Sequence, residues 1–89
     1  MITDEERRDY KKKQDALNIK VGERVLICRS AHFEEMGWDN SWLSEMNNTI
    51  DTVGIVKAIH DNQGIRIENP NGSIWGYPYF VLKFFEREA

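Results

Sequence analysis

The sequence predicts a small, mainly β domain, in which about five antiparallel strands close into a barrel after an N-terminal helix. Short runs rich in β-branched and aromatic residues alternate with tight-turn signals from residue 20 onward, which is typical of strands joined by hairpins. The first residues instead carry the charge order of a helix, and a chain of 89 residues is the size of one domain. We therefore divide it into a helical extension (residues 1–18) and a barrel (residues 19–89).

The N-terminal segment predicts a helix that begins after Thr3. The Thr3 hydroxyl can accept from the backbone of Glu6, whose carboxylate can reach back to Thr3, and the pair forms a capping box. Acidic residues come first and the lysines of residues 11–13 follow, which is the order that the helix dipole favours. Tyr10, Ala16 and Leu17 give one thin apolar stripe, so we expect the helix to dock through Tyr10 and Leu17 or to fray. It is then either a solvated extension or an arm that binds a partner.

The barrel region predicts strands separated by turns with recognisable chemistry. In order, we expect strands at 24–29 and 52–60, a turn at 61–64, a strand at 65–68, a turn at 69–72, a strand at 73–77, a single turn at 78–80 and a last strand at 81–85. Alternation places Ile65 and Ile67 on the inward face. The Asn-Pro-Asn-Gly turn combines a preset φ with residues that tolerate positive φ. Closure into a barrel would remove the strand edges that invite aggregation.

A long segment, residues 30–51, joins the first two strands. A loop of this length inside a compact domain is uncommon and usually functional. Residues 31–51 contain five acidic residues and no basic residue, whereas residues 17–30 carry a net charge of +2. This segment alone carries a charge of −5 against the −3 of the whole chain, so it repels phosphate backbones and suits a basic partner surface.

The long segment contains two tryptophans, which we expect to differ in burial. Trp42, Leu43 and Met46 recur at helical spacing and should anchor the loop to the barrel. Trp38 lies between Gly37 and an aspartate, and we expect it to be the exposed tryptophan. The loop would then be a rigid acidic surface held in place by apolar side chains.

Three sequence stretches together resemble the SH3-like small barrels: "VGERVLI", "TIDTVGIVKAI" and "SIWGYPYFVLKFF". The resemblance covers about residues 20–86 and depends on the spacing of Gly54, Val56, Trp75, Tyr77, Pro78 and Leu82. This spacing is similar to that of the Mind-bomb/HERC2-type domain and of small stand-alone SH3-like proteins from bacteriophages and large DNA viruses. The resemblance implies that the long loop and the segment 75–80 lie on the same side of the barrel. Such barrels bind peptides, methylated side chains, nucleic acids or other domains.

If loop and segment share one side, their aromatic and acidic residues would form a single binding groove. The candidate binding residues are Trp38, Trp42, Trp75, Tyr77 and Tyr79, with Glu35, Asp39 and Glu45. Aromatic faces attract cations, and the carboxylates would pair with Lys or Arg. Trp and Tyr also dominate the energetics of interfaces. The competing interpretation is that a domain this small needs the same tryptophans for its core, and we expect Trp42 or Trp75 to be mostly buried.

Enzyme chemistry is not indicated. One cysteine and two histidines (Cys28, His32 and His60) do not have the spacing of a metal site, and we expect neither a metal nor another cofactor. Cys28 lies in an apolar strand, so we expect a buried small hydrophobe rather than an activated nucleophile. No carboxylate pair stands apart from its acidic neighbours. We expect no catalytic residues.

Other classes of partner fit less well. Basic residues are dispersed and the aromatic-rich loop is acidic, so nucleic acid is an unfavoured partner. No apolar run approaches the roughly 20 residues of a membrane span, and charges begin at Asp4, unlike in a signal peptide. We therefore expect a cytoplasmic protein, in the host cytoplasm if the source is viral.

The sequence thus predicts a non-enzymatic protein- or peptide-interaction module that binds a basic partner through an acidic, aromatic-lined loop surface. One alternative is a phage or viral inhibitor of a host protein, which could act by acidic mimicry of nucleic acid. A further alternative is a binder of small ligands or nucleic acid. The oligomeric state is left open, and a homo-oligomer is compatible with the small-ligand alternative.

Overall fold

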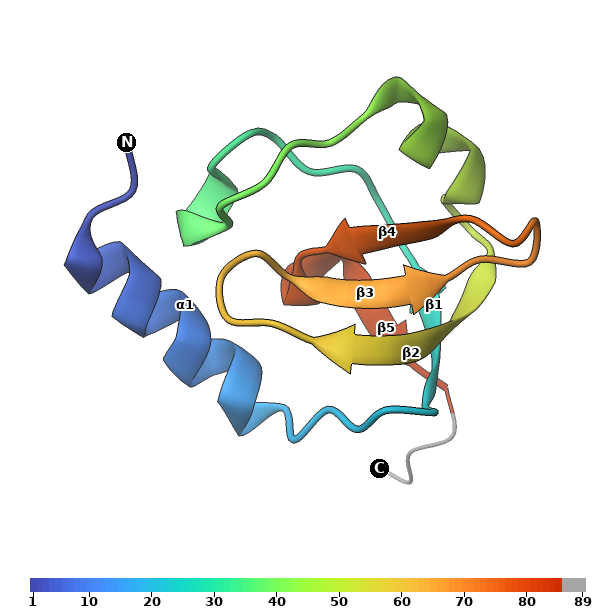
Figure 1. Ribbon diagram of the computed structural model, residues 1–89, viewed down its shortest axis with the longest axis horizontal. Coiled ribbons are helices and arrows are strands. Elements are labelled where there is room, and N and C mark those ends of the chain that lie inside the picture. Colours follow the sequence, from blue (N-terminus) through green and yellow to red (C-terminus); the bar gives the residue numbers. More distant parts are fainter. Residues whose placement is uncertain (86–89) are drawn as a thin grey trace.

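The computed structural model describes residues 1–85, in which one α-helix lies beside a five-stranded antiparallel sheet (Figure 1). The elements are α1 (Asp4–Ala16), β1 (Arg24–Ile27), β2 (Val53–Ile59), β3 (Ile65–Glu68), β4 (Ile74–Tyr77) and β5 (Leu82–Phe84). Short 3-10 helices lie in the connections: η1 (Glu35–Gly37), η2 (Ser44–Thr49) and η3 (Tyr79–Val81). The predicted mainly β architecture with a leading helix is confirmed.

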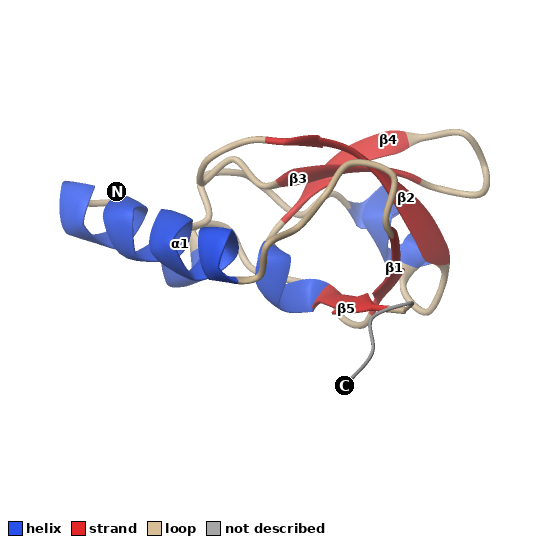
Figure 2. Cartoon of the chain, turned by 90° about the horizontal axis from the view of Figure 1, so that it is seen from below, coloured by secondary structure: helices blue, strands red, loops and turns tan. Residues whose placement is uncertain are grey.

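The sheet has the strand order β4-β3-β2-β1-β5, and each neighbouring pair is antiparallel. In the part of the chain that the structure describes, β4 and β5 do not pair with each other, so the sheet does not close as we predicted. The sheet is nevertheless strongly curved, with β4 and β5 at opposite ends of the curve (Figure 2). A register shift between Val56 and Ala58 marks a β-bulge, which increases the local twist and bends the strand.

The core lies within this curve. Ile65 and Ile67 of β3 face inward, as the alternation predicted, and both are fully buried. The other fully buried apolar residues of the strands are Val25, Ile27, Val56 and Tyr77. Gly54 allows β2 to approach β3 closely, because a Cβ there would lie 2.3 Å from a methyl carbon of Ile67. The inward residues therefore form one continuous core.

Helix α1 begins at the predicted capping box. The Glu6 backbone N–H donates to the Thr3 hydroxyl and the Thr3 N–H donates to the Glu6 carboxylate, both at 3.1 Å. The backbone N–H of Thr3, the largest cause, and the Thr3 hydroxyl both lower the pKa of the Glu6 carboxyl group. The helix lies on the side of the molecule opposite the β3–β4 turn (Figures 1 and 2).

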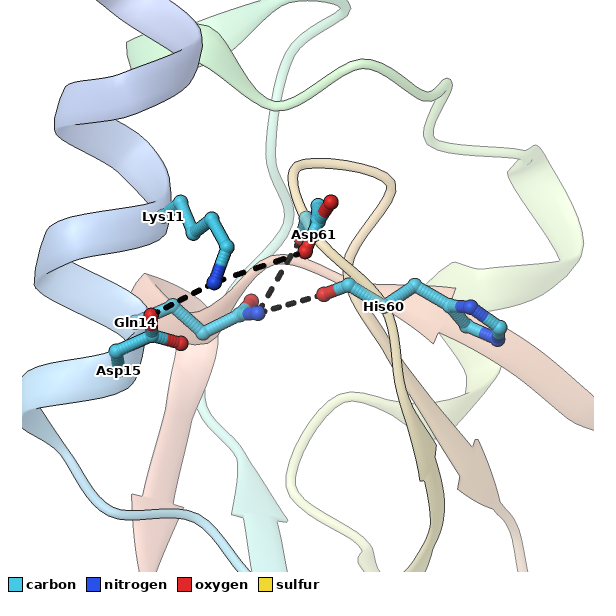
Figure 3. A network of polar contacts seen from close by, with 5 residues as sticks. All are labelled: Lys11, Gln14, Asp15, His60 and Asp61. Carbon is cyan, nitrogen blue, oxygen red and sulfur yellow. Dashed lines mark hydrogen bonds and ion pairs between the residues drawn. The ribbon is translucent and has the colours of Figure 1, made fainter.

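The helix docks through Tyr10, as predicted, and through Gln14 one turn later. The Gln14 side-chain amide donates to the backbone oxygens of His60 and Asp61, at 2.6 and 3.2 Å, in the turn between β2 and β3 (Figure 3). The Lys11 ammonium lies 2.8 Å from Asp15 and 3.9 Å from Asp61, so an ion pair flanks this contact (Figure 3). The predicted second anchor, Leu17, is only half-buried.

The expectation that Cys28 is buried was wrong. Strand β1 ends at Ile27, whose side chain is fully buried, and Cys28 is the exposed residue that follows. Its backbone N–H donates to the Val81 oxygen at 2.7 Å. Since side chains alternate along an extended chain, an inward Ile27 turns the next residue outward.

Candidate functional site

The prediction that Trp38 is the exposed tryptophan was wrong, because its side chain is fully buried. Gly37 has a φ of 91°, and a Cβ there would lie 2.9 Å from the Glu6 oxygen, so only glycine lets the chain pass this close to α1. Asn62 then holds the segment in place through two hydrogen bonds. Its side-chain amide donates to the backbone oxygen of Gly37, and its backbone oxygen accepts from the backbone N–H of Asp39. The indole N–H of Trp38 donates to the Gln63 oxygen at 3.3 Å, which satisfies its polar atom inside the core.

Trp42 and Tyr77 fasten the long loop to the sheet. Their rings meet edge to face at 5.6 Å, and the Trp42 indole N–H donates to Asn47 at 2.8 Å. The buried Tyr77 hydroxyl lies 2.8 Å from the Thr49 hydroxyl and accepts from Asn69 at 3.0 Å. Burial is the largest cause that raises the pKa of Tyr77. Tyr77 therefore has its polar atom satisfied within the fold and is not available to a ligand.

The predicted anchoring of the loop is confirmed for Met46 and wrong for Leu43. Met46 is 1% exposed, whereas 42% of Leu43 is exposed. The Leu43 N–H lies 3.3 Å from the Met46 sulfur, so the same turn that buries Met46 leaves the Leu43 side chain outside.

Tyr79 lies on the side of α1, and its ring contacts are with Tyr10 and Phe80 rather than with Trp42 or Trp75. Its ring packs against Tyr10 at 4.9 Å and Phe80 at 5.4 Å, and its backbone N–H donates to the Tyr10 hydroxyl. The Arg29 guanidinium lies 5.0 Å from the centroid of the Phe80 ring. We call Tyr10, Tyr79 and Phe80 the helix-side cluster. The single groove that we expected for all the candidate aromatics is thus not formed.

The three acidic candidate residues of the loop fall into two groups. Glu35 pairs with Arg29 at 3.0 Å and also accepts from the His32 backbone N–H. The Arg29 hydrogen bond is the largest cause that lowers the pKa of Glu35. Asp39 and Glu45 are exposed and, within residues 1–85, form no ion pair. These two carboxylates remain available to a partner.

A groove of about 320 Å³ runs between the loop and β4. We call it the β4 groove; it is lined by Asn40, Ser41, Leu43, Met46, Arg66, Ile74, Trp75 and Gly76. The loop forms one wall and the end strand of the sheet forms the other. Leu43 and Ile74 are 42% and 39% exposed, and Trp75 is half-buried against the core. The groove therefore offers apolar and polar surface side by side.

Of the predicted site residues, Trp75 lines the β4 groove, while Asp39 and Glu45 directly adjoin residues that line it. Sequence reasoning missed Arg66 and Ile74. The signal for both was the alternation of strands β3 and β4, because each residue lies next to an inward-facing one. Applying that alternation to the outer face of the hairpin would have found them.

Neither a protein-family model nor a curated protein matches this chain. Within residues 1–85, no His, Cys, Asp and Glu side chains group in a way that could hold a metal ion. Over the same residues, no helix has both the length and the apolar character needed to cross a membrane.

Proposed function

We propose that the chain is an SH3-like, non-enzymatic module that binds a protein or peptide of basic character in the β4 groove. The observation that carries the proposal is a partly apolar groove whose loop wall adjoins two carboxylates without ion-pair partners in the described residues. The fold assignment is supported by five antiparallel strands, a long connection after β1 and a 3-10 turn directly before the last strand.

The apolar part of the β4 groove provides the affinity. Burial of apolar surface contributes roughly 25 cal/mol per Å², and interface energies concentrate in a few aromatic and apolar anchors. Leu43, Ile74 and Trp75 are contributed by both walls, so apolar side chains of a partner would bury surface against both walls.

The acidic part provides the charge preference. Asp39 and Glu45 are exposed on a loop that has no basic residue between positions 31 and 51. Charges at the edge of an interface mainly raise the association rate and select the partner, and salt screens them. A basic partner should therefore associate faster at low ionic strength than at high ionic strength.

Panning a random peptide display library on the immobilised full chain tests this function. We expect the enriched peptides to contain an apolar residue beside Lys or Arg. By calorimetry, the Leu43→Asp variant should bind an enriched peptide at least about tenfold more weakly, since it places a charge in the apolar wall.

Val21→Asp is the matched control, because Val21 is 64% exposed and lies outside the β4 groove. It should leave peptide affinity unchanged. Failure to enrich any peptide, or equal binding by the wild-type and Leu43→Asp proteins, would overturn the proposed function.

A further inference from the structure

Strand β4 is an end strand of the sheet, so one of its two edges has no neighbouring strand. The backbone N–H of Asn69 donates to the Ser73 oxygen at 2.8 Å, which identifies this as a hydrogen-bonded pair of the β3–β4 hairpin. Such pairs alternate along an antiparallel ladder, and the register aligns Ile67 with Trp75 and Ile65 with Tyr77. The backbone groups of Trp75 and Tyr77 therefore point to β3.

It follows that the N–H and C=O groups of Ile74 and Gly76 point away from the sheet, into the β4 groove. Both residues line the groove. Within residues 1–85, no backbone hydrogen bond joins either residue to the loop wall. The groove thus contains a short row of donors and acceptors at the spacing of a β-strand, and an extended polypeptide matches that spacing.

We infer that the partner binds as an extended peptide that adds a strand to β4, with backbone hydrogen bonds to Ile74 and Gly76. The inference rests on the proposed function and specifies its geometry. Strand β4 has no lysine or proline, the residues that commonly protect an edge, whereas β5 at the other end carries Lys83.

The walls of the β4 groove favour one slender occupant. The loop residues Asn40, Ser41, Leu43 and Met46 face β4 across the groove, so a second copy pairing β4 with β4 would bring two such loops into the interface. A single extended segment needs only the space between loop and strand.

The charges of the two walls also define the peptide. Arg66 lies opposite Gly76 on the strand wall, whereas Asp39 and Glu45 belong to the loop. The peptide should place Lys or Arg toward the loop and a neutral or acidic residue toward Arg66. An apolar residue between them would contact Trp75.

The decisive comparison is between Ile74→Pro and Ile74→Ala. Both variants lose the Ile74 side chain, but only proline removes the N–H that points into the groove, and proline is tolerated at the first position of an edge strand. With a peptide enriched by the library selection, Ile74→Pro should bind about threefold to tenfold more weakly than Ile74→Ala, the range expected for one hydrogen bond. Thermal unfolding of both variants verifies that each is folded.

Amide hydrogen exchange of the wild-type protein gives a second measurement that needs no variant. Peptide binding should slow exchange at Ile74 and Gly76 by about tenfold or more, while Trp75 and Tyr77 are protected already in the free protein. If the peptide binds but the two variants have equal affinity, or Ile74 and Gly76 stay unprotected, the strand-addition inference fails and the proposed function stands. If no peptide binds the wild-type protein, both fail.

Discussion

The helix-side cluster and the β4 groove are both rich in apolar side chains, yet they differ in what remains unsatisfied. In the helix-side cluster, the Tyr10 hydroxyl accepts from a backbone N–H, and the rings of Tyr79 and Phe80 contact each other edge to face. In the β4 groove, Leu43 and Ile74 are exposed, and the backbone groups of Ile74 and Gly76 have no backbone hydrogen-bond partner within the described residues. The contrast teaches that aromatic residues alone do not indicate a candidate binding surface, and that exposed apolar surface beside unpaired polar groups is the better indication.

The comparison predicts that substitutions on the side of α1 mainly lower stability. Trp38→Ala should give the largest loss, about 3–5 kcal/mol of unfolding free energy, because it removes a fully buried indole and leaves a cavity. Urea unfolding measures this loss. A variant as stable as the wild type would mean that Trp38 is not part of the core.

Gln14→Ala should have the next largest effect, about 1–3 kcal/mol, because the His60 oxygen loses its side-chain donor and the Asp61 oxygen keeps only the Gly64 N–H. Lys11→Ala is the matched control, since its ion pairs are exposed to solvent and should change the unfolding free energy much less. Equal unfolding free energies for the two variants would show that the Gln14 amide does not hold the helix.

Glu35→Gln should have a smaller, pH-dependent effect of about 0.2–1 kcal/mol at neutral pH. The Arg29 hydrogen bond lowers the pKa of Glu35 in the folded chain below its ordinary value of 4.5, so the carboxylate stabilises the fold above that value. This contribution should disappear as the pH falls through the folded pKa. Melting temperatures of variant and wild type should therefore converge in acid, and a constant difference would contradict the assignment.

The double substitution Asp39→Asn/Glu45→Gln should have the smallest effect on stability, within about 0.5 kcal/mol, because both side chains are exposed. Binding of a basic peptide should nevertheless weaken and lose much of its salt dependence. Calorimetry at low and high ionic strength measures both. A salt dependence equal to that of the wild type would mean that these two carboxylates do not interact with the bound peptide.

The parts of the fold that were predictable depend on neighbours in sequence. The capping box at Thr3, the two hairpin turns and the inward face of Ile65 and Ile67 follow from local chemistry. The burial of Trp38 depends on contacts of the preceding glycine with α1 and of Asn62 with the same loop, and neither contact has a local signal. Closure of the sheet likewise depends on the separation of its two end strands.

The candidate site was predictable only in part, for the same reason. Trp75 and the loop carboxylates were identified from composition and spacing, but the division of the aromatic residues between two sides depends on where α1 packs. Gln14 looks like a surface residue in sequence, and its partners are backbone oxygens that sequence patterns do not display. Long-range backbone contacts therefore decided which aromatic residues became core.

The single thiol gives the chain a practical property that follows from the point where β1 ends. Cys28 is exposed and does not line the β4 groove, so a maleimide dye would attach at one defined position without blocking the proposed site. A fluorophore there provides an optical reporter for peptide titrations in which every tryptophan is left unmodified. The same exposure calls for a reducing agent in storage buffers, since two molecules could otherwise become linked through sulfur.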